Sequence, residues 1–162
     1  MAVDRRELAR LIPALRRYAR GLESDGAAAD DMVQDCLTLA LDREAQFRGG
    51  NLAAWVFTIL SNLGRSRYRS QRRAPMMLPL EDVRDEASDP AMRVAIFKAL
   101  ESLPDDQRKA LLLTAVEGFS YREVADMFGV PIGTVMSRIW RARAALAESL
   151  GGTSPVPFRR VK

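Results

Sequence analysis

Histidine is absent from this chain of 162 residues, and cysteine occurs only once, as Cys36. A single cysteine cannot form a disulfide within the chain, which favours a reducing environment. Without histidine, and with one cysteine, the usual zinc sites and histidine-based acid–base catalysis are excluded. Because Cys36 lies in an apolar run, we interpret it as a packing residue and not as a redox sensor. The sequence therefore predicts no metal, no cofactor and no enzymatic activity.

Long hydrophobic runs are also absent. None of the apolar stretches approaches the roughly 20 residues that a membrane-spanning helix needs. The first segment, MAVDRRELARLIPALRRYARG, mixes charges throughout and lacks the apolar block of a signal peptide. We therefore expect a cytoplasmic protein with no membrane segment of its own.

Aromatic residues make up only 7% of the chain, whereas hydrophobic residues make up 48%, enough to build a core. Ala, Leu, Arg and Glu dominate, and these residue types favour helices. In the first half, apolar residues recur at helical spacing over three segments, interrupted at Gly21 and at the glycine-containing loop 47–51. The predicted helices cover residues 4–18, about 25–47 and 52–73.

The helical pattern stops at residues 75–89, a segment with two prolines and five acidic residues that we interpret as a flexible linker. Beyond it, capping and helix-closing residues predict four further helices, which begin near Pro90, Pro104, Ser120 and Pro131. The expected fold class is all-α, with two small helical domains of three and four helices. The predicted divisions are residues 1–74, the linker 75–89, residues 90–150 and a tail at 151–162.

Residues 120–146 have the length and turn residues of a DNA-binding helix-turn-helix. Ser120 and Glu123 form a capping-box pattern at the start of a short helix, and Gly129 and Pro131 mark the turn. The second helix has an apolar face that is expected to pack inward: Val135, Ile139, Ala142 and Leu146. Its opposite face carries Gly133, Thr134, Ser137, Trp140 and Arg141, with Arg138 and Arg143 on the flanks.

This outward face is basic. From Phe128 to the end of the chain, Glu148 is the only acidic residue, against five arginines and one lysine. Such a face suits a groove lined with phosphates. An ordinary antiparallel helical pair with a solvated basic face is the alternative. Trp140 fits two roles, because it can pack on a neighbouring domain or on a sugar of the DNA.

A second basic region lies in the first half. Residues 62–73, NLGRSRYRSQRR, contain five arginines and no acidic residue. A run of one charge sign repels itself unless it binds a polyanion, so phosphate contact is favoured over simple solvation. Trp55 and Phe57 lie in the preceding apolar segment and are expected in the core. Phe47 stands beside Arg48-Gly49-Gly50-Asn51, where the backbone can approach a ligand closely, so we predict that Phe47 meets an unpaired base.

The helix before this loop has an acidic face, formed by Asp31, Gln34, Asp35, Thr38 and Asp42. Its buried side is predicted to hold Val33, Leu37, Ala40 and Leu41. An acidic face is unsuited to DNA, so it is either solvated or a protein-binding surface. From the residues alone, solvation is the simpler interpretation.

Three segments together resemble one protein family: DDMVQDCLTLAL at 30–41, FRGGNLAAWVFTILSNLGRSRYRSQRR at 47–73, and LPDDQRKALLLTAVEGFSYREVADMFGVPIGTVMSRIWRARAAL at 103–146. Their order resembles the extracytoplasmic-function (ECF) class of bacterial RNA polymerase sigma factors. The resemblance implies a region-two-like first domain and a region-four-like second domain. It also implies binding to core RNA polymerase, recognition and melting of promoter DNA, and control by an anti-sigma factor.

The resemblance assigns roles to individual residues. The acidic face would dock on the polymerase through Asp31, Gln34 and Asp35. The minus-ten element would be bound by Phe47, Arg48, Gly49, Gly50, Asn51, Asn62, Arg65, Arg67, Arg69, Arg72 and Arg73. The minus-thirty-five element would be bound by Thr134, Ser137, Arg138, Arg141 and Arg143. Many relatives carry a basic or polar residue at the position of Met136. Methionine there removes a possible hydrogen bond and leaves the base preference of this helix open, with apolar contact to a thymine methyl as one alternative.

Two rival functions follow from the same features. A sigma-like mimic that binds an anti-sigma regulator in place of DNA would be expected to lose the basic residues on both DNA faces, and this chain keeps them. A simple helix-turn-helix repressor leaves the acidic and basic surfaces of the first domain unexplained.

Overall fold

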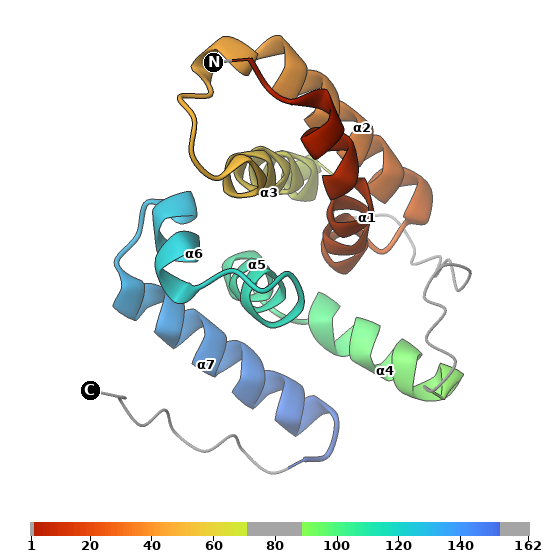
Figure 1. The fold of residues 1–162 in the computed structure, drawn as a ribbon. Helices are drawn as coiled ribbons and strands as arrows, with labels where there is room; N and C mark the ends of the chain where they lie inside the picture. Colours follow the sequence, from red (N-terminus) through yellow and green to blue (C-terminus); the bar gives the residue numbers. More distant parts are fainter. Residues whose placement is uncertain (1, 71–88, 153–162) are drawn as a thin grey trace. The chain divides into compact units, whose positions relative to one another are not determined.

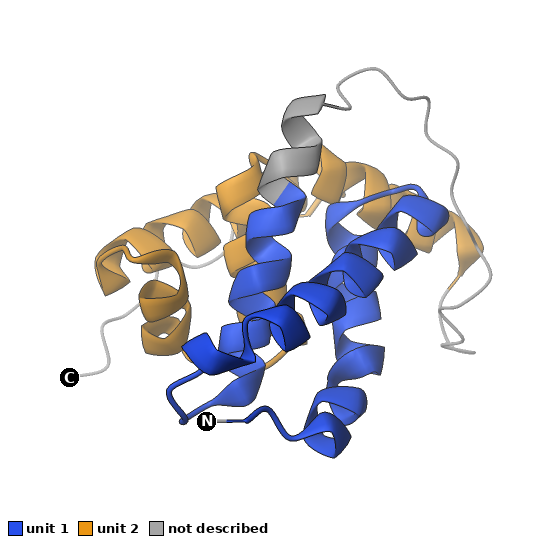
Figure 2. Cartoon of the chain, turned by 90° about the horizontal axis from the view of Figure 1, so that it is seen from above, with its two compact units in different colours: residues 1–80 blue, residues 81–162 orange. Residues whose placement is uncertain are grey.

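The computed structural model describes residues 2–70 and 89–152, and for residues 65–70 it describes the backbone alone. The described residues form seven α-helices and no strand, which confirms the predicted all-α fold. They divide into two compact units, residues 1–80 and residues 81–162 (Figure 2). The predicted domain boundaries stay predictions, because the division between the units falls outside the described residues.

Figure 1 shows the order of the helices in each unit. Unit 1 contains α1 (Arg5–Leu22), α2 (Gly26–Asp42), the 3-10 turn η1 (Glu44–Gln46) and α3 (Leu52–Ser70). Unit 2 contains α4 (Pro90–Glu101), α5 (Asp105–Leu111), the π-helical turn η2 (Leu112–Val116), α6 (Tyr121–Phe128) and α7 (Ile132–Ser149). Of the predicted linker only Asp89 is described, and of the predicted tail only residues 151 and 152.

Aspartates begin the first two helices. A carboxylate oxygen of Asp4 accepts a hydrogen bond from the backbone N–H of Arg6 at 2.8 Å, and Asp25 accepts one from Ala27 at 3.0 Å. Helix α1 continues to Leu22, so the prediction that it ends at residue 18 before a break at Gly21 was wrong. A helical glycine costs about 1 kcal/mol, too little to end a helix whose last turns pack on other helices.

The core of unit 1 joins α1 to α3 through Tyr18, which is 1% exposed. The Tyr18 ring lies 5.4 Å from the Phe57 ring, and the Tyr18 hydroxyl lies 2.8 Å from the Ser61 hydroxyl oxygen. This bond satisfies two polar groups that would be costly to bury alone. It also anchors the part of α3 that carries Asn62, one residue further along. The prediction that Phe57 lies in the core is confirmed.

Helix α2 buries one narrow stripe against α1 and α3: Ala29, Met32, Val33, Cys36 and Ala40. Each step of four residues rotates about 40° around a helix. Two such steps from Val33 carry Leu41 off this stripe, and its side chain is 36% exposed. The prediction that Leu41 is buried was therefore wrong.

Cys36 is fully buried, and its thiol donates to the backbone oxygen of Val56 at 3.5 Å. Burial raises the pKa of the Cys36 thiol to about 12. The thiolate is the reactive form of cysteine, so this residue stays protonated and inert near neutral pH. The interpretation of Cys36 as a packing residue is confirmed.

In unit 2, α5 continues beyond Leu111 as the π-helical turn, in which the Glu117 N–H bonds to the Leu112 oxygen at 3.1 Å. Gly118, with φ of 77°, follows this turn, as predicted for a helix end. Helices α4, α5 and α6 pack against α7 and bury its inner face. The position of α7 is thus set by three neighbouring helices.

Candidate polymerase and nucleic-acid interface

The helix-turn-helix is built from α6, a short turn and α7. The Ser120 hydroxyl accepts from the Glu123 N–H at 3.1 Å, and the Glu123 carboxylate accepts from the Ser120 N–H at 2.8 Å. This capping box satisfies two N–H groups that the first turn of α6 would otherwise leave without partners. Gly129 has φ of 63°, in the left-handed region that favours glycine, and it turns the chain towards α7.

The inner face of α7 is fully buried at Val135, Ile139 and Ala142. Because a helix buries one face at this spacing, the opposite face is turned outward. Ser137 and Arg141 are exposed on it, Thr134 is half-buried at one border, and the exposed Arg143 lies on the other flank. These four side chains are at least partly accessible, and their contacts with DNA stay a prediction.

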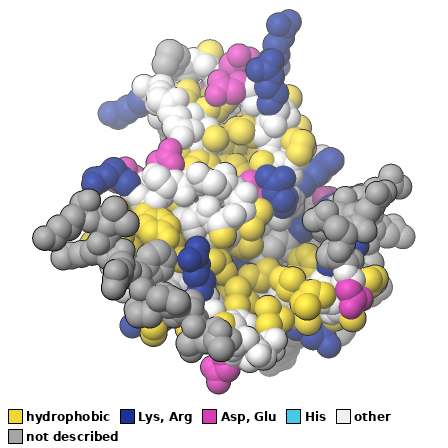
Figure 3. Space-filling model, turned by 60° about the horizontal axis from the view of Figure 1, so that its bottom comes forward, with side chains coloured by type: hydrophobic (Ala, Val, Ile, Leu, Met, Phe, Trp, Pro, Cys, Tyr) yellow, Lys and Arg dark blue, Asp and Glu magenta, His cyan; other side chains and the backbone are white. Residues whose placement is uncertain are grey.

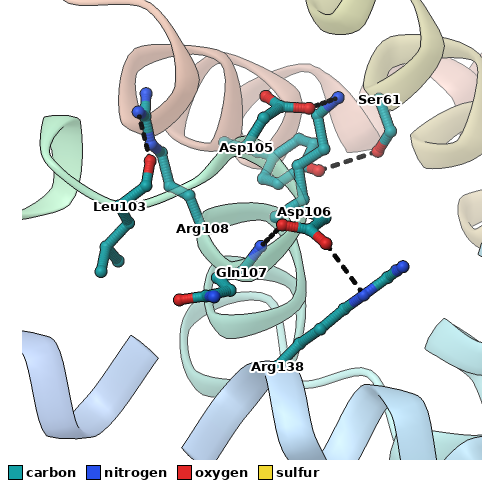
Figure 4. A network of polar contacts seen from close by, with 9 residues as sticks. Ser61, Leu103, Asp105, Asp106, Gln107, Arg108 and Arg138 are labelled. Carbon is teal, nitrogen blue, oxygen red and sulfur yellow. Dashed lines mark hydrogen bonds and ion pairs between the residues drawn. The ribbon is translucent and has the colours of Figure 1, made fainter. Parts of the chain in front are cut away.

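Arg138 is different, because it is held by an acidic residue of α5. Its Nε atom lies 3.2 Å from a carboxylate oxygen of Asp106, and the side chains are 22% and 43% exposed. The other carboxylate oxygen of Asp106 accepts from the Gln107 N–H at 2.9 Å (Figure 4). The pairing of Asp106 could not be identified from the sequence, since the two acidic residues at the start of α5 indicate only a helix N-terminus.

A second arginine in unit 2 has a structural role. Arg108 is 5% exposed, and its Nη2 atom donates to the backbone oxygens of Glu101 at 2.9 Å and Leu103 at 3.1 Å (Figure 4). These bonds join the end of α4 to α5. Because α5 packs on α7, Arg108 helps to fix the position of α7 without contacting its outward face. Its basic charge is directed inward and is unsuited to DNA.

The loop before α3 buries Phe47 and exposes Arg48 and Asn51. Phe47 is only 8% exposed, and its ring lies 5.3 Å from the ring of Trp55. Packing on Trp55 leaves little of this ring exposed, and its contact with an unpaired base stays a prediction. Arg48 and Asn51 are exposed, while the Asn51 side-chain oxygen accepts from the Ala54 N–H at 3.1 Å and caps α3.

Gly49 and Gly50 give this loop its shape, with φ values of 87° and 92°. Side chains rarely adopt such angles, so both positions suit glycine. On α3, Asn62 is exposed and follows the buried Ser61. The backbone of Arg65, Arg67 and Arg69 belongs to α3, whereas Arg72 and Arg73 lie outside the described residues.

The acidic face of α2 is turned away from its buried stripe. Asp31, Gln34 and Asp35 are all exposed, and so is Asp42 in the last turn. Thr38 donates its hydroxyl to the backbone oxygen of Gln34 at 3.0 Å and therefore stays on this helix. Unit 1 thus presents a carboxylate-rich surface suited to a basic protein partner.

The described part of the chain has no candidate membrane-spanning helix and no candidate metal-binding cluster. None of its helices is long and apolar enough to cross a membrane. In the same residues, no group of three or more acidic, cysteine or histidine side chains could hold a metal ion.

Each unit matches a known family model. Residues 93–146 match the model described as Sigma-70, region 4. Residues 8–61 match the model described as the sigma2 domain of PhyR. The second match ends one residue before Asn62, so it covers the acidic face and the loop but not the arginine run.

Comparisons over the whole chain identify the protein family. The chain is 41% identical over 145 residues to the ECF RNA polymerase sigma factor EcfG of Rhodopseudomonas palustris, covering 86% of this chain and 80% of that protein. It resembles the sigma factor RpoE of Bartonella quintana, solved with the anti-sigma factor NepR, with a TM-score of 0.80, 36% identity and coverage of 90% and 95%. It also resembles CnrH, solved with the cytosolic domain of CnrY, with a TM-score of 0.71, 30% identity and coverage of 90% and 86%.

Two helical units with these surfaces define a promoter-recognition subunit, and the chain belongs to the family of ECF RNA polymerase sigma factors. A sigma factor directs RNA polymerase to promoters and is not itself an enzyme.

Proposed function

We propose that unit 1 binds core RNA polymerase and the minus-ten element, and that unit 2 binds the minus-thirty-five element. The observation that carries this division is the placement of charge. Unit 1 exposes carboxylates on α2 and carries the arginine run at the end of α3, whereas α7 exposes arginines and has no acidic side chain before Glu148. Opposite charges on separate helices suit two different partners.

The polymerase contact is assigned to Asp31, Gln34 and Asp35. All three are exposed on one face of α2, whose opposite face is packed in the core of unit 1. A rigid helix presents these side chains in a constant arrangement, which favours a specific protein interface over simple solvation. Substitution of Asp31 by lysine should weaken assembly with core polymerase before any DNA is involved.

The minus-ten contact is assigned to the loop 47–51, to Asn62 and to the arginines that follow it. Glycines at positive φ let the loop backbone approach an extruded base, and the exposed Asn62 amide can donate and accept hydrogen bonds. Arg65, Arg67, Arg69, Arg72 and Arg73 supply charge for the strand phosphates. Holding one extruded base offsets an unstacking cost of a few kcal/mol and so favours melting.

The minus-thirty-five contact is assigned to α7. Ser137 and Arg141 are exposed and Thr134 is half-buried on the outward face, where a helix-turn-helix contacts the major groove, and the exposed Arg143 lies on its flank. Arg138 contributes to phosphate contact while Asp106 holds its Nε atom. With both units in one chain, binding of the first element raises the effective concentration of the second unit at its own element.

An anti-sigma factor is proposed as the regulatory partner. Two of the similar solved structures contain such a complex or a cytosolic regulator domain, RpoE with NepR and CnrH with CnrY. Because its partners are polymerase and chromosomal DNA, we place the action of this chain in the cytoplasm.

A sigma-like mimic is the second candidate function. The match of unit 1 to the PhyR sigma2 model favours it, and a PhyR fragment has itself been solved with NepR. The basic surfaces count against it, since a mimic needs neither exposed arginines on α7 nor the arginine run after Asn62.

The assignment is tested by separating polymerase binding from melting. Asn62→Ala should reduce open-complex formation, measured by permanganate reactivity of the melted thymines, while core polymerase binding stays unchanged. Asp31→Lys is the matched control with the opposite expectation, because it should weaken binding to core polymerase itself. Equal loss of both activities in Asn62→Ala would contradict its role in melting.

A further inference from the structure

Three large apolar side chains remain on the outside of α7. Ile132, Met136 and Trp140 are 39%, 37% and 42% exposed. They stand four residues apart, so each lies about one turn beyond the last and about 40° further around the helix. We call these three residues the apolar stripe.

The apolar stripe is distinct from the core of unit 2. The core face of α7 is formed by Val135, Ile139 and Ala142, all fully buried. The opposite border of the outward face carries Thr134 and Arg141. The outward face of α7 therefore has an apolar border and a polar border, with the exposed Ser137 between them.

The surroundings of the stripe indicate what it binds. Arg141 and Arg143 are exposed on the same helix, and α7 carries no acidic side chain before Glu148. Figure 3 shows hydrophobic side chains exposed on the face that it presents, with lysines, arginines and acidic side chains around them. An apolar surface beside exposed arginines on the same helix suits a ligand that is polyanionic and also carries apolar groups at its contact surface.

DNA offers one such group in the major groove, the C5-methyl of thymine. In a helix-turn-helix, the N-terminal residues of the recognition helix approach the base edges. Ile132 is the first residue of α7 and Met136 lies in its second turn, so both fall in this part of the helix. The unbranched thioether of methionine adapts its shape to an apolar partner.

We propose that Met136, supported by Ile132, contacts a thymine methyl group in the distal promoter element and makes recognition there depend on that methyl. This inference rests on the proposed DNA contact of α7. It identifies the base feature that α7 recognises through apolar contact, in addition to the hydrogen bonds and phosphate contacts of Ser137 and Arg141.

Replacement of thymine by deoxyuridine removes the methyl and leaves the hydrogen-bonding groups of the base in place. Holoenzyme made from the full chain and core polymerase would be bound to promoter duplexes with each distal-element thymine replaced in turn. At one position or more, the replacement should weaken binding about fourfold, the value of one buried methyl-sized group. With Met136→Ala, the thymine and deoxyuridine duplexes should bind equally at that position.

Arg141→Ala is the matched control. It should weaken binding to both duplexes and keep the fourfold preference for thymine, which separates the methyl contact from the general DNA contact. Met136 is exposed, so its truncation should leave thermal unfolding unchanged.

Three outcomes overturn the inference. If Met136→Ala still binds the thymine duplex more tightly than the deoxyuridine duplex, Met136 does not contact the methyl group. Unchanged duplex binding by Met136→Ala together with weaker binding to polymerase or to a regulator assigns the stripe to a protein partner. Unchanged duplex binding by both Met136→Ala and Arg141→Ala shows that α7 does not bind the element, and then the proposed function fails as well.

Discussion

The guanidinium Nε of Arg138 lies 3.2 Å from a carboxylate oxygen of Asp106, which joins the recognition helix α7 to the first turn of α5. The second oxygen of Asp106 is held by the Gln107 N–H at 2.9 Å, so the carboxylate is itself oriented. An arginine held at Nε still has both Nη groups to donate. In the proposed DNA contact of α7, this pair would orient the Arg138 cation towards a phosphate.

This arrangement predicts an unusual effect of removing an acidic residue. Loss of a negative charge normally strengthens DNA binding. Asp106→Ala should instead weaken binding to the distal element about two- to fivefold, because Arg138 loses the partner that orients it. The effect corresponds to about 0.5–1 kcal/mol, a size that suits a pair with partly exposed side chains. Fluorescence anisotropy with a labelled duplex measures it.

Asp126→Ala is the control for charge alone. Asp126 is exposed on α6, and its removal should leave binding unchanged or strengthen it. Asp106→Asn keeps an acceptor oxygen and should recover part of the loss. Tighter DNA binding by Asp106→Ala would show that Asp106 competes with DNA for Arg138.

Two glycines of the helix-turn-helix should respond in opposite directions to the same change. Gly129 has φ of 63°, so alanine there is strained and Gly129→Ala should lower the free energy of unfolding by about 1 kcal/mol. Gly133 lies inside α7 at ordinary helical angles, and an added Cβ meets nothing within 4 Å. Gly133→Ala should raise the unfolding free energy by up to about 1 kcal/mol.

Urea unfolding followed by circular dichroism measures both glycine variants. Effects of the same sign would contradict the conformations assigned to the turn and to the first turn of α7.

Cys36 should be unreactive in the folded protein. A pKa of about 12, against 9.0 for an ordinary thiol, lowers the thiolate population about a thousandfold near neutral pH. Labelling with a thiol reagent at pH 8 should therefore be slow in the native state and fast in urea. Rapid labelling of the native protein would contradict the burial of this residue.

The same pKa predicts a stability change at high pH. Between pH 9 and 12 the folded protein keeps the Cys36 proton, whereas the thiol of the unfolded chain loses it. The stability that this difference contributes is therefore intact below pH 9 and is lost as pH rises towards 12. Cys36→Ala should flatten the dependence of unfolding free energy on pH in that window, by comparison with the wild-type chain. If the unfolding free energy of the variant depends on pH as that of the wild-type chain does, groups other than Cys36 cause the dependence.

Helix existence and type could be predicted from the sequence because local signals agreed with the packing. Ser120 and Glu123 marked the start of α6, Gly129 marked the turn, and the spacing of Val135, Ile139 and Ala142 defined the buried face of α7. The error at Gly21 arose because a local helix breaker was outweighed by packing of the last turns of α1.

The candidate site was less predictable where it depended on contacts between distant residues. Phe47 looked available in its glycine loop, yet Trp55 holds its ring in the core at 5.3 Å. Asp106 showed no sign of its pairing with Arg138, since nothing local links the start of α5 to α7. Periodicity indicates which face is outward, and only the fold shows which outward side chains are already occupied.

Run-off transcription with core RNA polymerase on a promoter library tests the central claim most directly. Added chain should produce transcripts from a restricted set of promoters with common minus-ten and minus-thirty-five elements, and Arg141→Ala should lose selectivity at the distal element alone. Absence of chain-dependent transcripts from every promoter, while the chain binds an anti-sigma factor, would contradict the claim and identify it as a mimic.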